Sequence, residues 1–145
     1  MAHQGKPFNQ GHEFAAAGTS SPLRGPDQNQ VDFELEFLSG VLGRYPEYVD
    51  VLRVMGHLLT LKGRFGEGLQ VDRRLVQLRH NDALAHYNLA CSLALLKRAE
   101  QSIQTLRRAV ELGYRDFRYM REDHDLDSIR HDPRFRQLIR ELENR

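Results

Sequence analysis

The sequence predicts an all-α fold, an α–α superhelix of stacked antiparallel helix pairs that ends in a C-terminal capping helix. The first observation is a 34-residue period: the segment starting at Val49 aligns with the segment starting at Ala83, which brings the small residues Gly56 and Ala90 to the same position. The second is apolar residues that recur three and four positions apart. The third is short intervals of about two to four residues between apolar stretches, which make neighbouring helices antiparallel.

Residues 1–30 are predicted to form a flexible N-terminal tail. Glycine and proline recur in this segment, and its large apolar residues besides Met1 are Phe8, Phe14 and Leu23. So little apolar surface does not offset the entropy lost on ordering the chain. A tether or a docking strand remains open as the role of this segment.

The first helix is expected from residue 31 to about residue 43. Its apolar stripe consists of Val31, Leu35, Leu38, Val41 and Leu42, and we expect Phe33 and Phe37 to widen it. Asp32 is expected to cap this helix or to lie in its first turn. Gly43 and Pro46 bracket its end, because proline cannot continue a helix.

Two helix pairs are expected to follow, at about 48–62 with 65–79 and at about 83–96 with 99–112. Gly56 lies in mid-helix, where glycine costs about 1 kcal/mol relative to alanine, so a closely approaching helix is needed to explain it. Gly68 is expected on the facing helix. Gly63 and Gly113 are expected to end their helices.

The C-terminal stretch, residues 117–145, interleaves aspartate with arginine. Asp132 followed by Pro133 is typical of an N-cap and a first helical position, so a final amphipathic helix is expected to run to about Leu142. The acidic and histidine cluster of this stretch invites a metal site, but helix capping and Asp–Arg pairing are the favoured interpretation. The residues of that cluster are His124, Asp125, Asp127, His131 and Asp132.

The small, large and stop positions of both units resemble the tetratricopeptide repeat family. The first unit matches it at Leu52, Met55, Gly56, Leu59, Phe65, Gly68, Leu75 and His80, and the second at His86, Leu89, Ala90, Leu93, Ser102, Leu106 and Ala109. The resemblance implies a half repeat at 31–48, full repeats at 49–82 and 83–116, and a cap at 117–145. The cap is similar to the segment that closes such arrays at Phe117, Asp125, Leu126, Arg130, Asp132, Pro133, Arg134, Phe135 and Leu138. The departures from the family are Asp72 where an aromatic residue is usual, His86 where tryptophan is common, and His80 and Tyr114 at the usual proline position.

The resemblance also implies a concave groove, lined by the first helix of each pair, that binds a peptide of a partner protein. The candidate peptide-binding residues are Arg53, His57, Tyr87, Asn88, Cys91 and Arg118. Some members of the family grip a terminal carboxylate at positions that correspond to Arg53, His57, Asn88, Arg118 and Glu122 here, and Glu122 carries the opposite charge. A groove in which these side chains are merely solvated remains open.

These features favour a non-catalytic protein–protein interaction module that binds a peptide or helix of another protein. The alternative is a self-assembling structural subunit that oligomerises through the first helix, because that helix lacks one neighbour. We expect no enzyme, cofactor or metal. Cys91 with His57 or His86 has no third group to orient the pair.

Composition narrows the partners and the compartment. The formal net charge is +1 and arginine is mixed with acids, so neither nucleic acid nor a membrane is an expected partner. No apolar run approaches the ~18 residues of a spanning helix. The chain has 1 cysteine and no basic start followed by an apolar core, so we expect a cytoplasmic protein.

Overall fold

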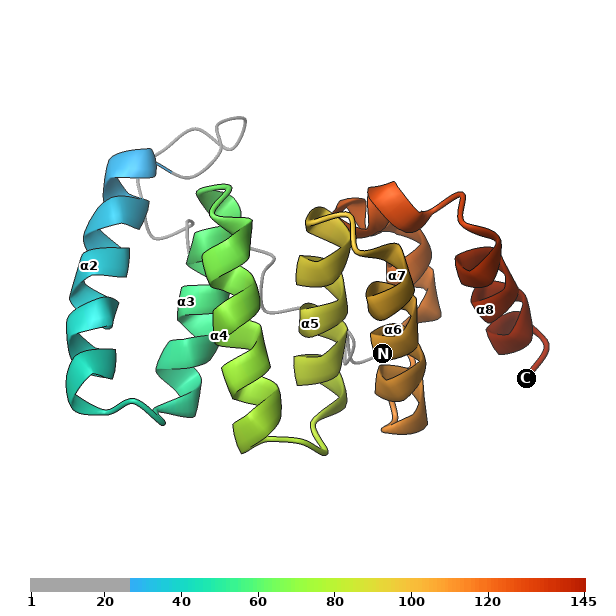
Figure 1. The fold of residues 1–145 in the computed structure, drawn as a ribbon, viewed down its shortest axis with the longest axis horizontal. Coiled ribbons are helices and arrows are strands. Elements are labelled where there is room, and N and C mark those ends of the chain that lie inside the picture. Colours follow the sequence, from blue (N-terminus) through green and yellow to red (C-terminus); the bar gives the residue numbers. More distant parts are fainter. Residues whose placement is uncertain (1–26) are drawn as a thin grey trace.

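The computed structural model describes residues 27–145, and these residues form helices and no strand. The elements are α2 (Gln28–Arg44), α3 (Val49–Leu61), α4 (Phe65–Leu78), α5 (Ala83–Leu95), α6 (Ala99–Glu111), α7 (Phe117–Glu122), the 3₁₀ helix η1 (His124–Ile129) and α8 (Pro133–Glu143). The predicted all-α fold is therefore confirmed. The helices lie side by side in chain order, from α2 at one end to α8 at the other (Figure 1).

The predicted tail falls mostly outside the described residues. Residues 28–30 belong to α2 and not to the tail, so this helix begins three residues earlier than expected. The reason is its cap: the Asp27 side chain accepts a hydrogen bond of 2.9 Å from the amide of Asn29. Asp32 lies within the helix instead and pairs with Lys62 at the end of α3 at 2.9 Å.

The helices pack as antiparallel neighbours, α3 with α4 and α5 with α6, and α4 also packs on α5. The small residues of both pairs lie in corresponding surroundings, as predicted. A Cβ atom on Gly68 would lie 3.9 Å from the carbonyl oxygen of Gly56. At the same place in the next pair, the Ser102 hydroxyl donates a hydrogen bond of 2.8 Å to the carbonyl oxygen of Ala90.

The turns inside the two pairs also correspond. Gly63 and Lys97, which are 34 positions apart, both have a positive φ, of 74° and 60°. Their amides donate to Thr60 and Ala94 at 3.0 and 2.9 Å. The second turn thus requires a lysine to adopt the left-handed conformation that glycine adopts easily in the first.

One sequence prediction about α2 is wrong. Phe33 and Phe37 were expected to widen its buried stripe, but they are 65% and 63% exposed. Helix α2 packs chiefly on α3, and only Val31 and Leu35 of α2 are fully buried. Periodicity placed the two phenylalanines close to the stripe, but no second helix covers their side of α2 in the part of the chain that the structure describes.

The C-terminal elements form a cap held by aspartate side chains. Asp116, Asp123 and Asp132 each accept a backbone hydrogen bond of 2.9 to 3.0 Å at the start of α7, η1 and α8. Pro133 is the first residue of α8, as predicted. The buried apolar side chains of α5 to α8 form the largest core cluster. Among residues 27–145, none of the helices combines the length and apolarity needed to cross a membrane.

Candidate functional site

Helix α5 carries three of the six residues predicted to bind a peptide, and all three are buried. Tyr87 stacks on Tyr114 with ring centroids 4.3 Å apart. Its hydroxyl donates a hydrogen bond of 2.7 Å to Oδ2 of Asp123, at the start of η1. Tyr87 therefore joins α5 to the cap, and its ring is not exposed to a partner in this conformation.

Cys91 lies one turn further along the same face of α5. Its sulfur lies 3.6 Å from Oδ2 of Asp123 and makes a weak hydrogen bond there. Burial raises the pKa of the Cys91 thiol well above its ordinary value, and the negative charges of Asp123 and Asp125 act in the same direction. The thiol is therefore protonated and unreactive at neutral pH, which is the state of a packed cysteine rather than a nucleophile.

Asn88 differs from its neighbours in what its side chain contacts. It is 6% exposed, and its Oδ1 has no hydrogen-bond partner among the described residues. Three and four positions on lie Cys91, which contacts Asp123, and Ser92, which contacts Asp72. Side chains at these spacings are neighbours on a helix, so Asn88 lies between the contacts to the cap and the contacts to α4.

The remaining three candidates lie on α3 and α7. Arg53 pairs with Asp82, which also caps α5 by accepting from the amides of Leu84 and Ala85 at 3.0 and 3.2 Å. Arg53 thus ties α3 to the start of α5. His57 is buried, whereas Arg118 is an exposed residue whose side chain lies 3.6 Å from Glu122.

The structure therefore brings Tyr87, Asn88 and Cys91 together on one helix face and places Arg118 on the surface. Because Tyr87, Asn88 and Cys91 are all buried, a peptide could contact them only after a rearrangement. The peptide-binding role of all six residues stays a prediction.

Asp72 is an important residue that sequence reasoning did not place in the site. It is buried on α4, and the Ser92 hydroxyl of α5 donates to its Oδ2 at 2.5 Å. Burial raises the pKa of Asp72 to about 7, although the hydrogen bond from Ser92 favours the charged form. Its departure from the family pattern was the signal in the sequence that could have found it.

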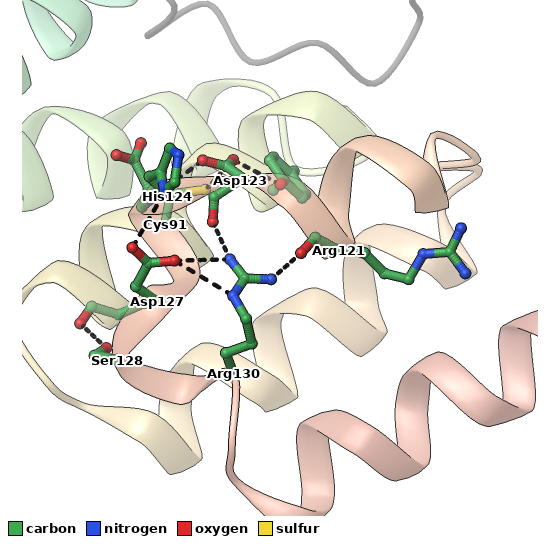
Figure 2. A network of polar contacts seen from close by, with 10 residues as sticks. Cys91, Arg121, Asp123, His124, Asp127, Ser128 and Arg130 are labelled. Atoms are coloured by element: carbon green, nitrogen blue, oxygen red, sulfur yellow. Dashed lines mark hydrogen bonds and ion pairs between the residues drawn. The ribbon is translucent and has the colours of Figure 1, made fainter.

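Asp123 is the second residue that was missed, and it is the centre of a polar network. Its carboxylate accepts from Tyr87, Cys91 and the amide of Asp125, while its carbonyl oxygen accepts from Arg130. Figure 2 shows how the Arg130 side chain reaches both this carbonyl and the carboxylate of Asp127, 3.0 Å away. Burial raises the pKa of Asp123, whereas the hydrogen bond from Tyr87 lowers it.

The same network contains a set of atoms with metal-ligand spacing. One ligand atom each from Cys91, Asp123 and Asp125 lies within 4.8 Å of the others. The hydrogen bonds of the first two residues to one another and to Tyr87 account for their positions without an ion. No metal site is inferred from this group.

Among the histidines and aspartates that were weighed as a metal cluster, Asp132 acts as a cap and Asp127 pairs with Arg130 and His124. Asp132 caps α8 and binds Arg134 at 2.7 Å. Asp127 lies 3.2 Å from Nδ1 of His124, and His131 faces Arg136.

An open surface pocket of about 350 Å³ lies against the cap. Its lining combines two apolar side chains with four guanidinium groups, from Phe135, Ile139, Arg121, Arg130, Arg136 and Arg140. Two of these arginines are paired with carboxylates, Arg121 with Glu143 and Arg130 with Asp127, and Arg136 contacts His131. The pocket is therefore less basic than its composition indicates.

Comparison with known proteins gives a partial match and no family assignment. No family model matches it. A 61-residue stretch is 31% identical to a curated chloroplastic protein of Arabidopsis thaliana. The match covers 42% of this chain and 18% of that protein, so the chain is similar to a small part of this relative.

Proposed function

We propose that this chain is a non-catalytic protein-interaction module of the tetratricopeptide-repeat type, which binds a peptide or helix of a partner protein in a groove along α3 and α5. Two helix pairs with the same small-residue contacts, 34 positions apart, are the arrangement that such a superhelix requires. The cytoplasmic location expected from the sequence stays a prediction.

The observation that carries the proposal is that the side-chain carbonyl oxygen of Asn88 has no donor among the described residues. A buried carbonyl oxygen without a donor costs about 1 to 3 kcal/mol, and natural proteins retain few of them. Oδ1 of Asn88 has no partner among the described residues. A backbone amide of a peptide is a donor of the right kind, and Asn88 would accept one such bond once binding opens its surroundings.

The electrostatics of the surroundings favour a donor as well. Two buried aspartates contact the residues three and four positions after Asn88: Asp123 accepts from Cys91, and Asp72 accepts from Ser92. The peptide is therefore expected to present N–H groups to this part of α5 and not a terminal carboxylate.

A substitution at Asn88 tests the proposal. The partner is first captured from the native cell with the wild-type chain and identified by mass spectrometry, and its affinity is then measured by calorimetry. Asn88→Leu removes the acceptor and is expected to weaken binding at least tenfold, which corresponds to about 1.4 kcal/mol. The same substitution should stabilise the free chain by about 1 kcal/mol, because an unsatisfied buried group is removed.

Gln104→Leu is the matched control, since Gln104 is exposed on α6 and lies outside the proposed groove. It should leave the affinity unchanged. Equal affinities of the wild type and Asn88→Leu, with unchanged helicity, would remove the groove from the proposal.

A further inference from the structure

The outward face of α2 carries an unusual row of side chains. Phe33, Phe37, Gly40 and Arg44 follow one another at spacings of four, three and four residues. This spacing brings them into one line along a helix and is the spacing of a coiled-coil seam. All four residues are exposed, and the two phenylalanines are among the most exposed large apolar residues of the described chain.

The equivalent positions of the two later helices are largely polar. Moving the first three members of the row 34 positions along the chain gives Glu67, Val71 and Arg74 on α4. The valine among them is half-buried and packs against the core, so it is no exposed apolar residue. A further 34 positions give Gln101, Thr105 and Arg108 on α6. The repeat therefore does not require exposed aromatic or small residues at these positions. Helix α2 differs in this respect from α4 and α6, whose equivalent residues are largely polar.

Gly40 has no explanation within the described chain. A Cβ atom at this position would meet no atom within 4 Å, unlike one at Gly56, and Gly40 does not have a positive φ. Glycine is a poor helix former in mid-helix, so an alanine would suit an isolated α2 better. A close approach by another molecule is a physical reason to keep it.

We propose that the outward face of α2 binds the same face of a second copy of this chain, with the two α2 helices antiparallel. The row contains two kinds of seam position, Phe33 and Gly40 being of one kind and Phe37 and Arg44 of the other. In an antiparallel pair, each position of one kind faces a position of the other kind on the partner helix. Phe37 of one copy then faces Gly40 of the other, and Phe33 faces Arg44. The two central layers each join a large side chain to a position that lacks one.

Self-complementarity is what identifies the occupant as a second copy. A two-fold axis between Phe37 and Gly40 matches every member of the row to another member of the same row, as an isologous interface requires. A parallel pair would instead set phenylalanine on phenylalanine and glycine on glycine, which overfills one layer and leaves the next one empty. The outer layers would place the guanidinium of Arg44 against the ring of Phe33, a favourable cation–π contact.

The size of this interface predicts a weak dimer. Helix α2 has 17 residues, which span about 25 Å at the rise of an α-helix. One such helix pair buries less than the ~1,200 Å² at which stable interfaces begin, so we expect a dissociation constant on the order of 10–100 μM.

Sedimentation velocity of the full chain from 1 to 300 μM tests the proposal. The wild type should pass from monomer to dimer across this range. Gly40→Leu should weaken the dimer more than tenfold because it fills the space that Phe37 needs. Gly40→Ala should weaken it less, while it raises the urea midpoint of the dilute monomer because helix propensity improves.

Gly66→Ala is the matched control: Gly66 is also open, but it lies on α4, so this change should leave dimerisation unaltered. A wild type that stays monomeric at 300 μM overturns the proposal, and so does a Gly40→Leu variant that dimerises as well as the wild type. Radical footprinting of Phe37 tests the remaining alternative, in which residues 1–26 of the same chain occupy this face. Protection at every concentration would assign this face to residues 1–26 of the same chain and overturn the second-copy interface.

Discussion

Asp72 shows how one buried carboxyl group contributes to the pH dependence of this fold. Burial raises its pKa to about 7 in the folded chain, above the ordinary value of 3.8. Between these two values the folded state holds one proton more than the unfolded state, so the free energy of unfolding falls as the pH rises. The contribution of Asp72 is fully present below pH 4 and is lost as the pH rises through about 7.

Asp72→Asn is expected to remove the contribution of this residue, because the amide stays neutral and still accepts the hydrogen bond from Ser92. One group contributes a slope of at most about 1.4 kcal/mol per pH unit, so the variant should become the more stable chain above pH 7. Urea unfolding of both chains at pH 5, 6, 7 and 8 measures the difference. Parallel stability curves would show that Asp72 titrates in the folded state as it does in water.

The two helix pairs have equivalent turns whose residues can be compared directly. Gly63 and Lys97 occupy the same turn position with a positive φ, but only the glycine adopts it without a steric cost. Lys97→Gly should therefore raise the free energy of unfolding by about 1 kcal/mol. Thermal and urea unfolding test this, with Gly63→Ala as the reverse control, which should destabilise the chain. A neutral Lys97→Gly would mean that the lysine side chain makes a compensating contact.

The starts of α3 and α5 form a second matched pair. Asp82 caps α5 with its side chain, whereas its counterpart 34 positions earlier, Tyr48, makes no capping bond although its backbone is extended in the same way. Tyr48→Ser supplies a capping oxygen without adding charge beside Asp50, and should stabilise the chain by about 1 kcal/mol. Urea unfolding and helix content by circular dichroism measure the effect, and a Tyr48→Ala variant separates capping from the loss of the ring.

The elements of this fold were largely predictable because their signals are local. Helix boundaries from α3 to α6 follow from short-range apolar spacing and from stop residues such as Gly63, and the Asp132–Pro133 start of α8 is equally local. The exposure of Phe33 and Phe37 was not predictable from spacing, because it depends on whether a second helix covers α2. The start of α2 was missed because Asp27, which caps it, lies in a segment whose composition is typical of a tail.

The helix face of the candidate site was predictable from the sequence, but the burial of its residues was not. Spacing along α5 correctly brings Tyr87, Asn88 and Cys91 to one face. Their burial depends on Asp123, which lies 36 positions after Tyr87 and 32 after Cys91 and contacts both. A single sequence gives no distance between such residues, so the network between α5 and the cap emerged only from the structure.

The whole molecule is unevenly packed along its length. Helix α5 has nine buried residues and packs on α4, α6 and η1, whereas α2 has two buried residues and packs chiefly on α3. Stability in an array of stacked helix pairs is approximately a sum over neighbouring interfaces, so an end with one interface opens most easily. The cap residues protect the opposite end by covering α5 and α6.

Hydrogen exchange should reveal this gradient along the chain. At low micromolar concentration the amides of α2 should exchange fastest among the long helices, α3 next, and those of α5 and α6 slowest, because local opening of α2 exposes little apolar surface. Mass spectrometry of peptic peptides measures the order. Destabilising α8 with Leu138→Ala removes a buried side chain of the cap cluster and should raise exchange in α5 and α6 far more than in α2. Equal acceleration in all helices would mean that the array opens as one cooperative unit, in which the end helices are as strongly coupled to the core as α5 is.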